Sequence, residues 1–183
     1  MSILLFLLDT LFFVLVACAL ARAWMNQQRI HMAAQPGPFV MAVTNWLVQP
    51  LRRAMPASMK QSRWDWASLL AAVVLSLVYG VVAVLLLSLA SFASPGGAMW
   101  ATGALLLAVK HLVRTVLQGL MLLLLAYAVL SWVQPHSPVM GTLERLSAPI
   151  LRPLRRVVPL VGGVDLSVLI AIVLLQVGLM VLG

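Results

Sequence analysis

The sequence predicts an all-α membrane protein: four transmembrane helices in two parallel helix–basic loop–helix repeats, with short interfacial helices in the cytoplasmic loops. Composition, four long apolar stretches and a duplicated motif carry this prediction. Of the 183 residues, 63% are hydrophobic and 9% are charged, whereas soluble domains carry about 45–50% apolar and about 25% charged residues. The composition therefore places the chain in a membrane.

Four apolar stretches are the candidate membrane spans: residues 3–23, 66–92, 116–133 and 166–182. Residues 3–23 reach about 31 Å as a helix, close to a hydrocarbon core of about 30 Å. This stretch lacks a preceding basic segment and is longer than a signal-peptide core of about 7–15 residues, so we expect a retained helix. Residues 98–109 reach only about 18 Å and could form a re-entrant helix, an interfacial helix or the start of the third span.

The distribution of positive charge predicts the orientation in the membrane. The chain has 12 Lys and Arg residues against 4 Asp and Glu residues. With four spans, residues 24–65 and 134–165 lie on one side and, with Arg22 at their edge, hold all the cations except Lys110 and Arg114. By the positive-inside rule both loops are cytoplasmic and both termini face outward. A fifth span at residues 98–109 would separate the two basic loops and is disfavoured.

A motif occurs twice, as PLRRAMP at residues 50–56 and PLRRVVP at residues 153–159. In each case an aspartate and a serine follow and begin the next apolar stretch. Because both copies are expected on one side of the membrane, the repeats are parallel. We therefore divide the chain into a first repeat (1–92), a connecting segment with a short apolar or interfacial helix (93–115) and a second repeat (116–183).

Each basic loop also contains apolar residues at helical spacing, which predicts a short helix in the membrane interface. Pro50 and Pro153 are expected to end these helices, because a proline disfavours helical geometry in the residue before it. In the second loop Gly162 and Gly163 allow a tight turn and Asp165 can cap the last helix. The predicted structural motif comprises Pro50, Pro56, Asp65, Pro153, Pro159, Gly162, Gly163 and Asp165.

Four segments of the chain resemble the YggT (YlmG) family of integral membrane proteins: ALARAWMNQ, QPLRRAMP, SWVQPHSP and APILRPLRRVVPLVGGVDLS. Residues 57–63 depart from the family pattern, which commonly has a shorter glycine-containing turn there. The resemblance implies a multi-pass protein of the bacterial inner membrane or of plastid membranes, without known catalytic activity. Relatives are linked to osmotic tolerance, to cell division and nucleoid or plastid organisation, and to haem assembly in the plastid cytochrome b6f complex.

The arginines of the two basic loops are the candidate binding residues, for anionic lipid headgroups or for an unidentified membrane protein partner. The alternative is that they only set the orientation and pair with Asp65, Asp165 or Glu144. Nucleic acid is a disfavoured partner, and a homo-oligomer is left open. The candidate residues are Arg52, Arg53, Arg152, Arg155 and Arg156.

Other polar residues give weaker signals. His31, His111 and His136 are expected to be interface histidines in different loops, so no metal site and no cofactor are predicted. Asp9, Arg22 and Lys110 are the ionisable residues near membrane depth, but each lies near the end of a span, where its side chain can reach water.

The function classes follow from these residues. Four acidic residues and one cysteine, without a nucleophile elbow or a phosphate-binding loop, disfavour an enzyme. The sequence predicts a non-enzymatic protein that organises or assembles a protein complex or anionic lipid at the cytoplasmic face. The alternative is a small channel or transporter for ions or osmolytes.

Overall fold

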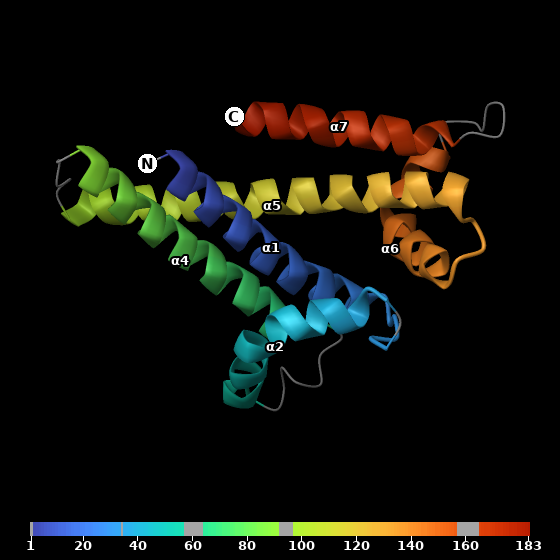
Figure 1. Ribbon diagram of the computed structural model, residues 1–183, viewed down its shortest axis with the longest axis horizontal. Coiled ribbons are helices and arrows are strands. Elements are labelled where there is room, and N and C mark those ends of the chain that lie inside the picture. The colour runs from blue at the N-terminus through green and yellow to red at the C-terminus, as the bar shows by residue number, and fades with distance from the viewer. Residues whose placement is uncertain (1, 34, 57–63, 92–96, 157–164) are drawn as a thin grey trace.

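The computed structural model describes residues 2–33, 35–56, 64–91, 97–156 and 165–183, and their regular structure is entirely helical (Figure 1). The predicted all-α class is therefore confirmed for this part of the chain. The helices are α1 (Ser2–Gln27), α2 (Gly37–Ala54), α4 (Trp66–Ser91), α5 (Gly97–Val133), α6 (Pro138–Arg155) and α7 (Leu166–Leu182).

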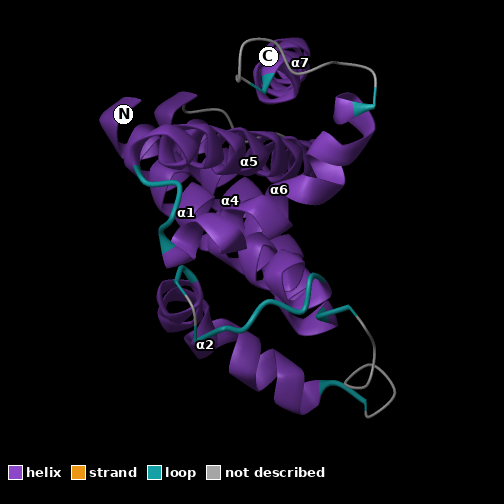
Figure 2. Ribbon diagram, turned by 90° about the vertical axis from the view of Figure 1, so that its right-hand side faces the viewer, coloured by secondary structure: helices purple, strands orange, loops and turns teal. Residues whose placement is uncertain are grey.

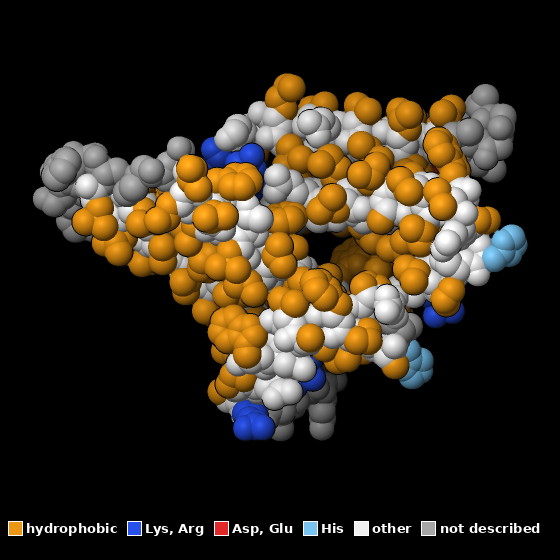
Figure 3. All heavy atoms as spheres, viewed as in Figure 1, with side chains coloured by type: hydrophobic (Ala, Val, Ile, Leu, Met, Phe, Trp, Pro, Cys, Tyr) orange, Lys and Arg blue, Asp and Glu red, His pale blue; other side chains and the backbone are white. Residues whose placement is uncertain are grey.

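Among the described residues, three helices are long and apolar enough to cross a membrane: Ile3–Gln27, Trp66–Leu89 and Met99–Val133. The fourth expected span, Leu166–Leu182, is apolar but has 17 residues, or about 25 Å as a helix. Large apolar side chains project outward along all four, as Leu7, Leu85, Leu106 and Val181 illustrate, and cover much of the face in Figure 3. Such surfaces suit a lipid environment.

Residues 98–109 are the first part of α5, which runs without a break for 37 residues. They form neither a separate re-entrant helix nor a separate interfacial one, and the expected third span, 116–133, is the second part of the same helix. No proline occurs between Pro95 and Pro135, and the stretch is rich in Ala and Leu, so nothing in it stops the helix. The full helix is about 55 Å long.

The helices expected in the two basic loops are present as α2 and α6, but the prediction that Pro50 and Pro153 end them is wrong. Both prolines lie inside their helices, which continue to Ala54 and Arg155. Figure 1 shows α2 bending between its cyan first part and its teal last part, as expected for an interior proline. The residue directly after each proline, Leu51 or Leu154, is half-buried and packs against an apolar cluster.

The helices form layers. In Figures 1 and 2 α7 lies on one side of α5, while α1 and α4 lie on the other, with α2 beyond them. One apolar cluster joins α1, α2 and α4 through residues such as Val16, Val48 and Ala71. A second joins α5, α6 and α7 through Leu124, Leu151 and Val168. The two clusters give each half of the chain its own core.

Helices α4 and α5 cross closely at small residues. A Cβ atom on Gly80 would lie 2.2 Å from the backbone oxygen of Ala104 and 3.0 Å from the Cβ of Ala108. Ala83 and Ala104 are buried at the same crossing. Small residues allow two membrane helices to approach in this way, so that van der Waals contact between their backbones holds them together.

Candidate functional site: the basic ends of α2 and α6

The candidate arginines lie at the ends of α2 and α6, which we call the basic end of the molecule. Their side chains are exposed, and Figure 3 shows Lys and Arg side chains over the end of α2. In Figure 1 both helices lie away from the two chain termini. The indole of Trp24, at the end of α1, donates a hydrogen bond of 3.1 Å to the carbonyl oxygen of Leu146 in α6, so the two halves of the chain are in direct contact here.

In the first half, Arg52 is held by the aspartate that precedes α4. A guanidinium nitrogen of Arg52 lies 2.8 Å from Oδ2 of Asp65, whose side chain is 4% exposed. Asp65 also accepts a hydrogen bond of 2.9 Å from the hydroxyl of Ser68. An acidic residue at the start of a helix is favoured by the helix dipole, and the arginine supplies the opposite charge that a buried carboxylate needs.

In the second half, Arg155 takes the corresponding position. Its Nε donates to Oδ2 of Asp165 at 2.8 Å, and one terminal nitrogen donates to the Tyr127 hydroxyl at 3.0 Å. Asp165 is the N-cap residue of α7 and accepts a hydrogen bond of 3.1 Å from the backbone N–H of Ser167. The cap expected from the sequence is therefore present.

This arrangement stabilises the charged forms of both partners. Burial alone would raise the pKa of Asp165, but hydrogen bonds from Ser167 and Arg155 outweigh it and hold that pKa below its usual value. Burial alone would likewise lower the pKa of Arg155, but its hydrogen bonds to Asp165 and Tyr127 raise it. The pair is thus fully charged at neutral pH.

The structure divides the candidate arginines into two sets. Arg52 and Arg155, the first member of each RR pair, make ion pairs within the protein. Arg152 and Arg156 are exposed and make no ion pair within the described ranges, and Arg53 is exposed as well. Of the three acidic partners expected, Asp65 and Asp165 are used, while Glu144 pairs with none of these arginines in the part of the chain described.

The remaining motif residues have simpler positions. Pro50 and Pro153 are exposed within their helices, and Pro56 is exposed just beyond α2. Pro159, Gly162 and Gly163 lie outside the described residues, so the predicted glycine turn stays a prediction.

Arg22 does not extend to water as expected. Its side chain is buried against α2, where one guanidinium nitrogen donates to Oγ1 of Thr44 and to Oδ1 of Asn45, each at 2.9 Å. The sequence placed Arg22 at the edge of a loop, but α2 folds back across the end of α1 and covers it.

His111 is a residue that sequence reasoning misplaced. It lies inside α5 instead of in a loop, its side chain is 4% exposed, and its Nδ1 lies 3.5 Å from Oδ1 of Asp9 in α1. The ring stacks on Tyr79 of α4, with the centroids 4.0 Å apart. The one signal in the sequence was Asp9 itself, an acidic residue in an apolar helix, which requires a partner.

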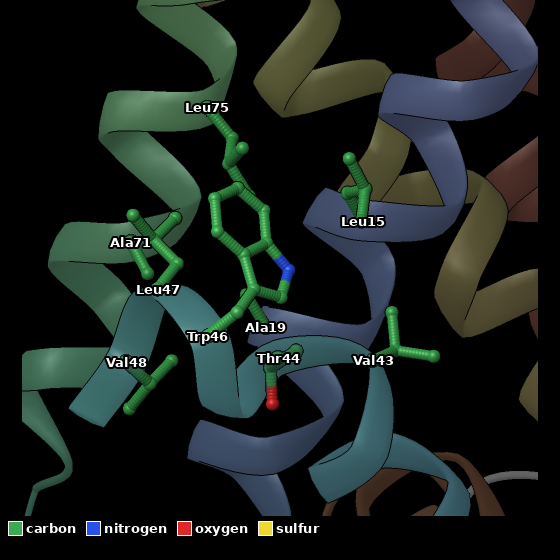
Figure 4. A pocket seen from close by; sticks show the side chains of 9 residues that line it. All are labelled: Leu15, Ala19, Val43, Thr44, Trp46, Leu47, Val48, Ala71 and Leu75. Atoms are coloured by element: carbon green, nitrogen blue, oxygen red, sulfur yellow. The ribbon is translucent and has the colours of Figure 1, made fainter. Parts of the chain in front are cut away.

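Other site types find little support in the described residues. No group of three or more His, Cys, Asp or Glu side chains in them could hold a metal ion. Figure 4 shows a shallow apolar groove between α1, α2 and α4, beside the indole of Trp46 and lined by Leu15 and Leu75. The Thr44 hydroxyl donates to the Val40 carbonyl oxygen and accepts from Arg22.

Comparison with known proteins gives a consistent result. The pattern of the CCB3/YggT family matches residues 1–86 and 106–183. The "Uncharacterized protein YggT" of Escherichia coli is 35% identical over 178 residues, covering 97% of this chain and 87% of that protein. An "Uncharacterized protein in proC 3'region" of Vibrio alginolyticus is 33% identical, covering 93% of this chain and 88% of that protein.

No solved structure gives a significant match. The family pattern spans most of the chain and includes both basic motifs, and the two relatives are similar over nearly their whole length. The chain therefore belongs to the CCB3/YggT family.

Proposed function

We propose that this chain is a non-enzymatic inner-membrane protein that organises or assembles partners at the cytoplasmic face by binding anionic headgroups through its basic end. The observation that carries the proposal is the division of the arginines. Arg52 and Arg155 are used to hold the fold together, whereas Arg152 and Arg156 project outward without an ion-pair partner in the described chain. The latter two are the ones available to bind something else.

The form of α6 supports a membrane-surface role. Leu143 and Leu146 are buried, while Glu144, Arg145 and Arg152 on the other side of the helix are exposed. A helix with one apolar face and one basic face can lie in the interface, where each cation near an anionic surface contributes about 1 kcal/mol. The same end of the molecule carries the arginines of α2.

The proposal includes the orientation of the chain in the membrane. Both basic loops lie in the cytoplasm, the termini face outward, and α7 crosses the membrane as a fourth span. The hydrogen bond from Trp24 to Leu146 supports a shared side, because it joins the end of α1 to α6. The two helix–basic loop–helix halves then act as parallel repeats, each with its Arg–Asp pair at the same point.

The proposal is tested by lipid binding to the purified protein. We expect native mass spectrometry to show phosphatidylglycerol bound in preference to phosphatidylcholine. The double change Arg152→Gln and Arg156→Gln should weaken phosphatidylglycerol binding about 30-fold, since two cations contribute about 2 kcal/mol. Lys110→Gln, a change of an exposed cation on α5, is the matched control and should leave binding unchanged.

Two measurements distinguish the binding of lipid headgroups from the assembly of a protein partner. Unchanged phosphatidylglycerol binding in the double variant would contradict the headgroup role. Extraction from native membranes in mild detergent then tests for an assembled partner: it should co-purify with the wild-type chain and be lost from the double variant. Thermal unfolding of both proteins checks that the variant is folded.

A pathway for small ions or osmolytes is the second candidate, favoured by the contact between Asp9 and His111 among the membrane helices. Ion flux into proteoliposomes that disappears on changing Asp9→Asn or Lys110→Gln would support it over the organising role. Few other ionisable groups occur in the spans, and conducting pores normally require more.

A further inference from the structure

A polar cluster lies where α1, α4 and α5 meet, far from the basic end. It consists of Asp9, Tyr79 and His111. The imidazole of His111 lies between two partners: its Nδ1 faces Oδ1 of Asp9 at 3.5 Å, and its ring stacks on that of Tyr79 at an interplanar angle of 24°. Three helices thus contribute one polar side chain each.

The other ring nitrogen of His111 has no partner. Nε2 is buried and makes no hydrogen bond within the described residues. With Nδ1 directed at a carboxylate, the neutral imidazole carries its hydrogen on Nδ1, and the lone pair is then on Nε2. A buried nitrogen with an unused lone pair is the basic atom of the cluster.

We propose that Asp9, Tyr79 and His111 form a proton-binding site, in which Nε2 of His111 takes up a proton and Asp9 is the counter-ion of the resulting imidazolium. The geometry fits each role. The Asp9 side chain is 45% exposed whereas that of His111 is 4% exposed, so Asp9 is the member of this pair that lies at the protein surface. The stacked ring of Tyr79 stabilises a cation against its face.

The surrounding charges are few. Asp9 faces the imidazole from α1 and Tyr79 from α4. On α5 itself Lys110 and Arg114 are exposed neighbours. Lys110 points toward the end of α7, with its Nζ 3.9 Å from where a Cβ of Gly183 would be. Asp9 is therefore the acidic group that faces His111 in the described chain and can act as its counter-ion.

Within the described part of the chain, no further carboxylate or imidazole forms an ion pair with this cluster. The nearest carboxylate before Tyr79 in the sequence is Asp65, which precedes α4 and lies 14 residues earlier, or about 21 Å along a helix. No Asp, Glu or His residue occurs between Asp9 and His31 or between His111 and His136. The cluster is therefore a site at which His111 can bind a proton beside its counter-ion Asp9.

Histidine NMR tests the proposal. In a protein carrying His31→Gln and His136→Gln, both changes of exposed side chains, ¹⁵N-histidine signals report His111 alone. We expect the Nε2 signal to titrate between pH 4 and 8. Asp9→Asn should lower the midpoint by at least about one pH unit, because it removes the neighbouring negative charge. Asp9→Glu keeps the charge and should restore a midpoint close to the original.

Two results of the histidine titration would contradict the proposal. A contact that serves packing alone would leave the Nε2 signal constant over this pH range, or would give the same midpoint before and after the change Asp9→Asn; either result overturns the proposal. Circular dichroism at each pH shows whether the protein is folded. If Asp9→Asn does not fold, the titration with native Asp9 still decides, since a signal that does not move contradicts the proposal by itself.

Discussion

Arg52 and Arg155 bind the aspartates that precede α4 and α7, and in doing so they join the end of each basic helix to the beginning of the next apolar helix. An arginine is suited to this because its planar guanidinium can donate to two acceptors at once, as Arg155 does to Asp165 and Tyr127. The contribution of each pair is moderate, since Arg52 and Arg155 are 49% and 37% exposed and solvent screens them.

The Arg155–Asp165 pair makes stability depend on pH in acid. Because the pKa of Asp165 is lowered in the folded protein, the stabilisation is fully present above the unfolded value of 3.8 and is lost as the pH falls through the lower folded value. Asp165→Asn keeps the helix cap but removes the charge. We expect it to cost about 1 kcal/mol at pH 7.

Thermal unfolding in detergent at several pH values measures this effect. The difference between wild type and Asp165→Asn should be constant from neutral pH down to about 5 and should shrink below the unfolded pKa. Glu144→Gln removes an exposed charge that makes no ion pair in the described chain and serves as the control. A difference that persists undiminished to pH 3 would rule out the carboxylate as its source.

For single residues, the sequence predicted which ones begin helices better than it predicted which side chains they contact. The positions of Asp65 and Asp165 ahead of apolar stretches were enough to identify them as helix starts. Which arginine of each pair they would bind depends on how α2 and α6 bend at Pro50 and Pro153, and a repeat motif does not contain that information. The contact between Asp9 and His111 joins residues about a hundred positions apart, so no local pattern reveals it.

Among the helices, the crossing of α4 and α5 depends most on a single residue. A methyl group at Gly80 would meet the Ala104 carbonyl oxygen at 2.2 Å, so Gly80→Ala must push two backbones apart. We expect a loss of about 1–3 kcal/mol, typical of overpacking in a well-packed core. Thermal unfolding or resistance to proteolysis in detergent measures it.

Gly119 is the matched control within α5. A Cβ there would meet nothing within 4 Å, so Gly119→Ala should be neutral or slightly stabilising because alanine favours the helix. Gly178→Ala, whose Cβ would make an ordinary contact of 3.5 Å with Leu117, should also be mild. Equal losses of stability at all three positions would mean that the glycines serve helix flexibility and not the close crossing of α4 and α5.

The sequence predicted the positions of the elements well and some of their ends poorly. Long apolar stretches predict helices because a membrane leaves the backbone few other choices. The beginning of α5 was uncertain because Lys110, His111 and Arg114 interrupt the apolar pattern although the helix continues through them. The ends of α2 and α6 were wrong because both helices continue past their prolines, with Leu51 and Leu154 directly after them packed against the two apolar clusters.

For the whole molecule, the contact between Trp24 and Leu146 joins the two halves at the basic end. Trp24→Phe keeps an aromatic ring but removes the N–H donor, so we expect α6 to be held less firmly, by about 1 kcal/mol. Hydrogen exchange of the α6 amides should speed up in this variant. Trp132→Phe changes an indole that is 75% exposed and should have no such effect.

If Trp24→Phe and Trp132→Phe change the hydrogen exchange of the α6 amides equally, the hydrogen bond of Trp24 is not what holds α6.

The contact between the two halves is also the feature that the sequence predicted least well. The repeated motif predicts two similar units, but the direct contact between them at the basic end arises from α1, the loop after it and α6 together, in a cluster that includes Met25, Ile30 and Leu146.

The central claim is that α2 and α6 lie together on the cytoplasmic side with the C-terminus outside. Cysteine labelling tests it directly, because Cys18 is the single cysteine and is buried, so Cys18→Ala gives a clean background. Variants with one cysteine in place of Gln49, Glu144 or Gly183 are then treated with a membrane-impermeant maleimide. The account predicts that Gly183→Cys is labelled in intact spheroplasts, whereas Gln49→Cys and Glu144→Cys are labelled only after permeabilisation. Labelling of Gln49→Cys and Glu144→Cys from opposite sides would contradict it.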